Sequence, residues 1–411
     1  MQRLTNVKLS RLLLIACWLS YAVISCSKMC VPTVISAMVN EGFLNKSQSG
    51  LLSGLFYLFY GAGQLFFGKY FNNHSPFIGP KLAILGSGVC CYLMSLTNNF
   101  YLLLLFWSLC AVFNACFFPA LMKIVSFNLK AEHSVWANNY MLIAQQLGTV
   151  ICLIAGSIIM KYIGWIKLYY FAAIISVITF IFWCYAEVRA KKSLLEVAGE
   201  GNSAVEASVI KEESIKKPII EYIGTGIFCV FTVSFLNSLI HGVKTWAPTI
   251  IMETYNTSPS FSVFLNIIIV ASNILFLLFL GRFAPRNKIK SVITFCILTL
   301  PFVVLMNFTS IINEYIYVFL MGLLTSLATY ITNVTAIQIP YYFDRFNDVA
   351  RVCGISNMCS SMGVLLGNWL YGVFADLFGW QIIMIMCIVF VVLIIVLMTI
   401  ADKGFKKFLK S

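Results

Sequence analysis

The sequence predicts an all-α membrane protein with twelve transmembrane helices in two related halves of six. Three observations support this fold class: an apolar composition, apolar stretches long enough to cross a bilayer, and basic residues in alternate loops. Hydrophobic residues make up 60% of the 411 residues and charged residues only 10%, whereas soluble domains carry roughly 45–50% apolar and about 25% charged residues. The mean hydropathy of +0.91 agrees. This composition excludes a water-soluble protein, because lipid must cover much of the apolar surface.

Each helix that crosses a bilayer needs about 20 predominantly apolar residues. We expect the first six spans near 12–38, 48–69, 82–98, 101–126, 136–160 and 167–186. The second six are expected near 219–250, 259–281, 291–308, 315–339, 352–374 and 381–401. The basic N-terminus leads into the first span without a small-residue cleavage site, so this span is expected to be retained.

Basic residues predict the orientation of these spans. The net charge is +13, and most Lys and Arg lie in the two termini and in alternate short loops, while the other loops hold little beyond Lys46 and Lys167. This is the positive-inside bias of membrane proteins. It predicts a multi-pass protein of the plasma membrane with both termini cytoplasmic, and it makes nucleic acid a poor candidate partner.

The segment 187–218 differs from the rest of the chain, because it balances six acidic against six basic residues and holds few large apolar ones. Such a composition is typical of a disordered or weakly helical linker. We therefore predict a six-helix bundle over 1–186, a cytoplasmic linker over 187–218, and a second six-helix bundle with a short cytoplasmic tail over 219–411.

Three sequence landmarks indicate that the halves are repeats. Lys-Tyr-Ile-Gly-Trp at 161–165 returns as Asp-Leu-Phe-Gly-Trp at 376–380, and Gly68-Lys69 returns as Gly281-Arg282. The pair Lys28 and Pro32 returns, with the same spacing, as Lys244 and Pro248. Internal repeats are common in secondary transporters, whose substrate sites lie at the repeat interface near the middle of the membrane.

Ionisable residues inside the predicted spans point to a substrate class. Lys28 lies near the middle of the first span, and Lys244 lies in the seventh, with His241 three residues before it on the same helix face. A central Lys costs around 2.5–3.5 kcal/mol on insertion scales, and no Asp or Glu lies deep in any span. An anionic substrate would compensate these cations. The alternative is that the lysines extend to the membrane surface, are solvated or lose their charge, and that His241 only packs.

Aromatic and amide side chains extend the candidate pocket. Tyr21 lies two turns before Lys28, and Tyr60 and Gln64 are one turn apart on the second span. Polar groups in membrane helices commonly hold neighbouring helices together, so this role stays open for each of them. Pro32 and Pro248 are expected to kink their helices, as gating joints or as passive bends.

The sequence gives no sign of a metal centre, a cofactor or enzymatic activity. The 14 Cys lie almost entirely within apolar runs and form no Cys-x-x-Cys pair or Cys/His cluster with metal-ligand spacing. Buried free Cys packs as a small hydrophobe. We expect no cofactor and no metal, a small-molecule substrate and the lipid bilayer as partners, and a monomer.

With two halves of six helices, a charged central linker and a short basic loop at 68–81, the chain resembles the major facilitator superfamily. The loop reads GKYFNNHSPFIGPK, which is similar to the Gly-x3-Asp-Arg signature of that superfamily. The resemblance implies a major facilitator fold and a gating role for Gly68 and for Asn72, which stands where the signature has its acid.

A finer resemblance, to the organophosphate:phosphate antiporters, covers most of the chain. It is carried by SKMCVPTVISAMVNEGF at 27–43, LIHGVKTWAPT at 239–249 and LYGVFADLFGW at 370–380. It implies that Lys28 occupies the place of a substrate-binding arginine and that Tyr21 and Tyr60 match cavity tyrosines.

The chain departs from that family at three positions. Ile240 replaces a second arginine, although Lys244 lies one turn on; Gln64 replaces a lysine, and Ala144 replaces a histidine. Arg matches phosphate with a planar fork, whereas Lys is a point charge. The sequence therefore favours a small organic anion, with a sugar phosphate, a glycerol phosphate and a carboxylate all open.

The predicted function is secondary active transport of such an anion by alternating access, through exchange or facilitated movement. The alternatives are a broad-specificity drug or metabolite exporter of the same fold and a membrane sensor that binds without transport. A membrane enzyme would need an acid/base constellation or metal cluster within the spans, and a channel is disfavoured by the repeat.

Overall fold

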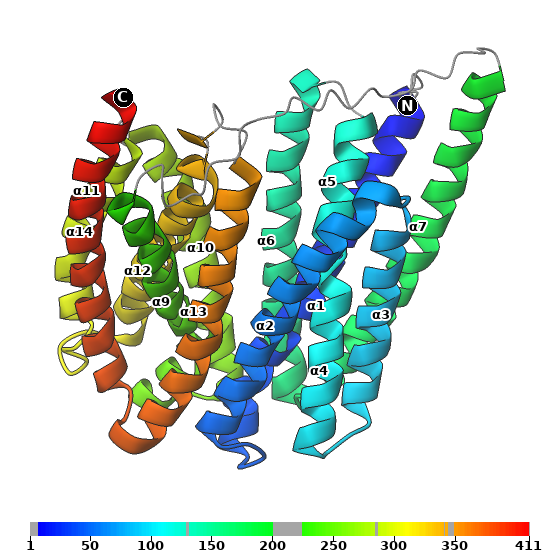
Figure 1. Cartoon of the computed structure of the whole chain (residues 1–411). Coiled ribbons are helices and arrows are strands. Elements are labelled where there is room, and N and C mark those ends of the chain that lie inside the picture. The colour runs from blue at the N-terminus through cyan, green and yellow to red at the C-terminus, as the bar shows by residue number, and fades with distance from the viewer. Residues whose placement is uncertain are drawn as a thin grey trace. The chain divides into compact units, whose positions relative to one another are not determined.

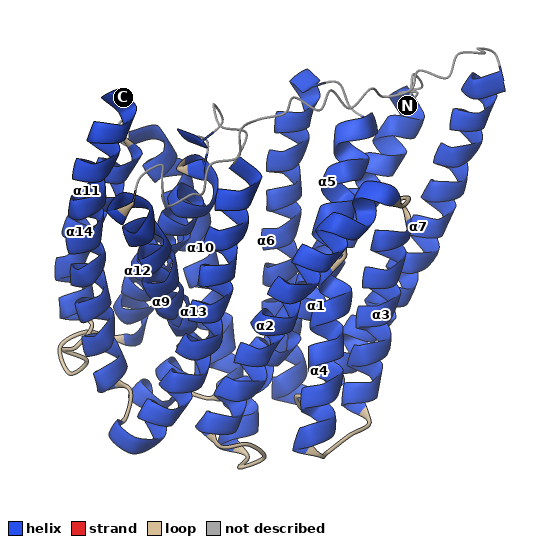
Figure 2. Cartoon of the chain, viewed as in Figure 1, coloured by secondary structure: helices blue, strands red, loops and turns tan. Residues whose placement is uncertain are grey.

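The computed structural model describes the backbone of residues 7–128, 131–199, 224–283, 287–340, 342–343 and 349–410. Within these residues the long regular elements are all helices, and there is no strand (Figure 2). Twelve helical stretches are long and apolar enough to cross a membrane. The predicted all-α membrane fold is confirmed.

The helices follow the chain as Figure 1 labels them. They are α1 (Val7–Asn40), α2 (Lys46–Asn73), α3 (Ile78–Ser95), α4 (Phe100–Ala115), α5 (Phe117–Asn128), α6 (Ala131–Tyr162), α7 (Lys167–Gly199), α9 (Thr225–Tyr255), α10 (Pro259–Phe283), α11 (Lys288–Leu305), α12 (Glu314–Asn333), a π-helical turn η1 (Val334–Gln338), α13 (Val349–Phe378) and α14 (Gln381–Lys410). Large apolar side chains along them are exposed, among them Phe66, Ile178, Phe228 and Leu275. A lipid-covered surface accounts for this exposure.

Two helices depart from the expected spans. The fourth span is divided into α4 and α5 at Cys116, because Pro119 has no N–H to donate to the carbonyl of Ala115. Helix α7 continues to Gly199, so residues 187–199, which were expected in the linker, are helical. Residues 200–218 of that linker lie outside the described part of the chain.

The contacts divide the chain into two compact units. Unit 1 comprises Met1–Val31 and Phe59–Glu212, and unit 2 comprises Pro32–Leu58 and Glu213–Ser411. The boundary therefore crosses α1 directly before Pro32 and crosses α2 after Leu58. The domain limits expected from the linker stay a prediction.

Unit 1 is held together by close helix contacts and by one buried ion pair. A Cβ added to Gly148 of α6 would meet the backbone carbonyl of Ala22 of α1, so only glycine permits this approach. The Nζ of Lys81 on α3 lies 3.1 Å from a carboxylate oxygen of Glu187 on α7, and Glu187 is buried. Because both charges are paired, the buried carboxylate is compensated.

In unit 2, α9 packs against α10, α12, α13 and α14. Gly367 of α13 lies against α9, where an added Cβ would be 2.9 Å from the carbonyl oxygen of Leu239. The indole Nε1 of Trp246 donates to the carbonyl of Asn368 at 3.0 Å. The start of α2 joins this unit, because Gly54 lies directly against the backbone of Leu365.

The structure supports one of the repeat landmarks in detail. Gly164 and Gly379 both have positive φ, at 96° and 75°, a conformation that glycine adopts without strain. Each is followed by a buried tryptophan, Trp165 or Trp380, whose carbonyl accepts from the backbone N–H three residues on. The same turn thus joins the last two spans of each half.

We expect Gly148→Ala to lower the thermal stability of the purified protein, because the methyl group would overlap the α1 backbone. Overpacking of this kind costs about 1–3 kcal/mol. Gly68→Ala is the matched control, since a Cβ there meets nothing within 4 Å. Equal melting temperatures for the two variants would contradict the close α1–α6 contact.

Candidate functional site

Lys28 of α1 and Tyr60 of α2 lie together in unit 1. The Nζ of Lys28 is 4.3 Å from the centroid of the Tyr60 ring, which is within the range of a cation–π interaction. Both side chains are half-buried. The structure therefore brings together two of the residues that the sequence singled out as a substrate site.

The side chain of Tyr21 is buried. Its ring is 9% exposed and packs against Phe117 at 5.4 Å and Phe118 at 6.4 Å between ring centroids. Gln64 is half-buried one turn after Tyr60. A packing role for Tyr21 is therefore visible, and a binding role for Tyr21 and Gln64 stays a prediction.

In unit 2, His241 belongs to a polar cluster between α9 and α12. Asn237 donates through Nδ2 to Thr332 Oγ1 and to the carbonyl of Ala328, each at 2.9 Å. His241 Nε2 lies 3.2 Å from the same Thr332 hydroxyl. That hydroxyl also donates to the Ala328 carbonyl oxygen, at 3.1 Å. The imidazole is held in place by its neighbours.

Lys244, one turn after His241, is half-buried. Among the described residues it forms no hydrogen bond and no ion pair. An ammonium group in a membrane helix without a carboxylate partner is costly. Of the candidate residues in unit 2, Lys244 is thus the one with unused capacity to bind an anion.

Both lysines lie four residues before a proline within a continuous helix. Pro32 lies inside α1 and Pro248 inside α9. Proline has no N–H, so neither can donate to the carbonyl four residues earlier, which belongs to Lys28 in one helix and to Lys244 in the other. Each candidate cation therefore coincides with a missing backbone hydrogen bond, where a helix bends most readily.

The structure offers less support for the other two gating candidates, Gly68 and Asn72. A Cβ at Gly68 would meet nothing within 4 Å, so packing does not require glycine there. The side chain of Asn72 lies outside the described residues. The gating roles of Pro32, Pro248, Gly68 and Asn72 stay predictions.

The structure adds a polar latch in unit 2 that sequence reasoning missed, formed by Lys46, Ser47, Glu253, Asp376 and Trp380. Lys46 Nζ lies 2.8 Å from Glu253 Oε2, which also accepts from the Trp380 indole at 2.9 Å. The Lys46 ammonium lies 5.4 Å from the Trp380 ring centroid. The backbone N–H of Ser47 donates to Asp376 Oδ2 at 3.1 Å. The latch joins the start of α2 to the end of α9 and to the turn between α13 and α14.

The sequence held one signal for this latch. Asp376 and Trp380 belong to the repeated landmark at 376–380, and Glu253 lies near the end of its span. No spacing rule connects them with Lys46, more than 200 residues earlier. Only the packing of the helices shows the cluster.

Among the described residues, no group of three or more His, Cys, Asp or Glu is arranged to hold a metal ion. The described cysteines form no disulfide with one another and are mostly buried.

Three solved structures share this arrangement of helices. A bacterial homologue of the human lysosomal transporter Spinster, inward-facing and unoccupied, has a TM-score of 0.77 and 14% identity, covering 98% of this chain and 99% of that one. The same homologue in an occupied inward-facing conformation gives 0.69 and 14%, covering 96% and 97%. A point mutant of the nucleoside transporter NupG gives 0.71 and 13%, covering 97% and 100%. At such identities the similarity shows the fold alone.

Among curated proteins, none matches the chain. The family model described as Major Facilitator Superfamily matches residues 17–341, which is well over half of the chain. Together with the twelve apolar helical stretches, this match shows that the chain is a multi-pass integral membrane protein with a secondary-transporter fold, and that it belongs to the major facilitator superfamily.

Proposed function

We propose that this transporter carries a small organic anion by alternating access, with Lys28 and Lys244 as its principal binding groups. The observation that carries the proposal is the half-buried Lys244 ammonium without an ion-pair partner among the described residues. An anion that arrives with each transport cycle would supply the missing charge. Lys28 is the equivalent group of unit 1, because it precedes its helix proline by the same four residues.

The surroundings of the two lysines favour a compact anion. The Tyr60 face shields one side of the Lys28 ammonium, and the His241 imidazole adds a polar group one turn from Lys244. Lysine binds an anion as a point charge without the two-pronged geometry of arginine. Phosphate esters of glycerol or sugars and small carboxylates therefore all fit the proposal.

The positions of the buried carboxylates favour exchange of one anion for another over coupling of transport to protons. The buried carboxylates of Glu187 and Asp402 lie near the ends of their spans. Glu187 pairs with Lys81 and Asp402 accepts from Asn287. Proton-coupled transporters commonly use acidic residues deep in the membrane. We further propose a monomer in the plasma membrane with both termini in the cytoplasm, on the strength of the basic loops.

A thermal-shift assay on the purified protein tests the substrate class. We expect glycerol 3-phosphate or small carboxylates to raise the melting temperature and glycerol or ethanolamine to have no effect. Lys28→Ala and Lys244→Ala should each weaken anion binding by about ten- to a hundredfold, as for the loss of a hydrogen bond to a charged group. Lys28→Arg should retain binding because it keeps the charge.

Lys69→Ala is the control, since Lys69 is an exposed cation of the same unit as Lys28. Stabilisation by amines or neutral solutes, or anion binding that both alanine variants leave unchanged, would contradict the proposal. Binding of lipophilic cations would instead favour a drug exporter.

The polar latch holds the start of α2 against the rest of unit 2. We expect Lys46→Ala to speed amide hydrogen exchange in residues 46–50 by up to about fivefold, because a partly exposed ion pair contributes about 0.2–1 kcal/mol. Hydrogen-exchange mass spectrometry measures this directly. The double variant Lys46→Glu with Glu253→Lys should restore part of the protection. If exchange in this segment is the same in all three proteins, the latch does not hold the start of α2 in place.

A further inference from the structure

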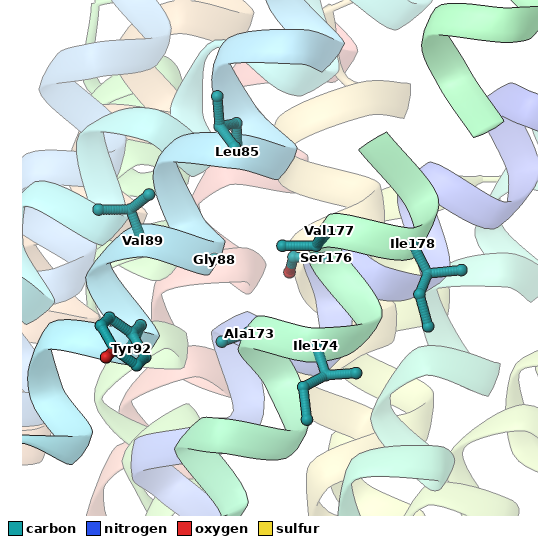
Figure 3. Close-up of a pocket in the computed structure, with 9 residues that line it drawn as sticks. All are labelled: Leu85, Gly88, Val89, Tyr92, Ala173, Ile174, Ser176, Val177 and Ile178. Carbon is teal, nitrogen blue, oxygen red and sulfur yellow. The ribbon is translucent and has the colours of Figure 1, made fainter. Parts of the chain in front are cut away.

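An apolar groove lies between α3 and α7 of unit 1 (Figure 3). Its volume is about 430 Å3. It is lined by Leu85, Gly88, Val89, Tyr92, Ala173, Ile174, Ser176, Val177 and Ile178. The two helices touch at small residues, since a Cβ on Gly88 would lie 2.7 Å from the Cβ of Ser176. The larger side chains rise on either side of this contact, which leaves the groove between them.

The groove faces the lipid. Both helices are long and apolar enough to cross the membrane, and the larger lining side chains are exposed, from Leu85 at 43% to Ile178 at 62%. In a bilayer an open apolar furrow at this depth is filled by hydrocarbon, because no water is present there. The natural occupant of such a groove is an acyl chain.

Beyond the Tyr92 end of the groove lie Tyr170 and Lys167, which do not themselves line it. The ring of Tyr92 contacts the ring of Tyr170, with centroids 6.0 Å apart, and the Lys167 ammonium lies 4.9 Å from the Tyr170 centroid. Lys167, Tyr170, Ile174 and Ile178 are spaced three or four residues apart along α7. They therefore form one stripe on the helix surface, with the cation at one end and aliphatic side chains at the other.

The length of this stripe matches one leaflet of a bilayer. Lys167 and Ile178 are separated by eleven residues, which corresponds to about 16 Å of helix. Half of the hydrocarbon core measures about 15 Å. A chain lying against Ile178 and Ile174 would thus end with its headgroup beside Lys167, at the depth where tyrosines and lysines meet phosphate groups.

The basic residues near this end of the groove favour a lipid with an anionic headgroup. Lys161 and Lys167 flank the turn between α6 and α7, and residues 157–170 contain no Asp or Glu. The facing turn between α3 and α4, residues 92–101, has no acidic residue either. The two lysines therefore give this end a net positive charge, which attracts an anionic headgroup.

We propose that the groove between α3 and α7 is a specific site for one anionic phospholipid, with an acyl chain along Ile174 and Ile178 and the phosphate at Lys167. The site is independent of the transported substrate, since it uses none of the residues proposed to bind the anion.

The test uses the full chain in vesicles that contain equal amounts of phosphatidylglycerol and phosphatidylcholine. After extraction, native mass spectrometry counts the lipids that stay bound. We expect one phosphatidylglycerol per chain in preference to phosphatidylcholine. Lys167→Gln should reduce this preference several-fold, because it removes the cation beside the headgroup, and Lys167→Arg should keep it.

A second variant tests the acyl groove. Val177→Phe fills the groove and should reduce retention of both lipids several-fold, whereas Ile154→Phe, at an exposed position of α6 away from the groove, should not. Equal retention of the two lipids by the unchanged protein, or no effect of Val177→Phe, would overturn the proposal. Displacement of the lipid by inorganic phosphate alone would also overturn it, since a headgroup pocket without an acyl site would then account for the binding.

Discussion

The absence of water from the bilayer interior is the constraint on which the rest of this structure depends. A backbone N–H or C=O group left without a partner there costs several kcal/mol, so a chain that crosses the membrane does so as helices. This explains why long helices dominate the described residues and why the boundaries follow the apolar stretches. It also makes any interruption of the helical hydrogen bonds conspicuous. In α1 and α9, Pro32 and Pro248 make such interruptions, and each lies four residues after a lysine.

The same constraint connects Lys28 and Lys244 with bending of the helices that carry them. Because each proline removes the hydrogen bond to the carbonyl of Lys28 or Lys244, the charge and the weak point of the helix coincide. In α1 the boundary between the two compact units falls directly before Pro32. Binding of an anion and bending of the helix would then involve the same helical turn. This would couple anion binding to a conformational change.

Much of this fold was predictable from the sequence, and the site less so. The expected span 259–281 corresponds to α10, Pro259–Phe283, because apolar length alone fixes a membrane helix. The division at Cys116 was missed, since the apolar composition continues across it. The contact of Lys46 with Glu253 and Trp380 could not be predicted, because tertiary packing brings together residues that are distant in sequence. Lys28 and Tyr60 were named individually, and their cation–π contact follows from the crossing of α1 and α2.

Transport by purified protein in proteoliposomes tests the central claim, that Lys28 and Lys244 make this chain an anion carrier. We predict uptake of small phosphate esters or carboxylates against a preloaded anion, no uptake of neutral or cationic solutes of the same size, and loss of uptake in Lys28→Ala and Lys244→Ala. Uptake of neutral or cationic solutes that Lys28→Ala leaves unchanged would contradict the account.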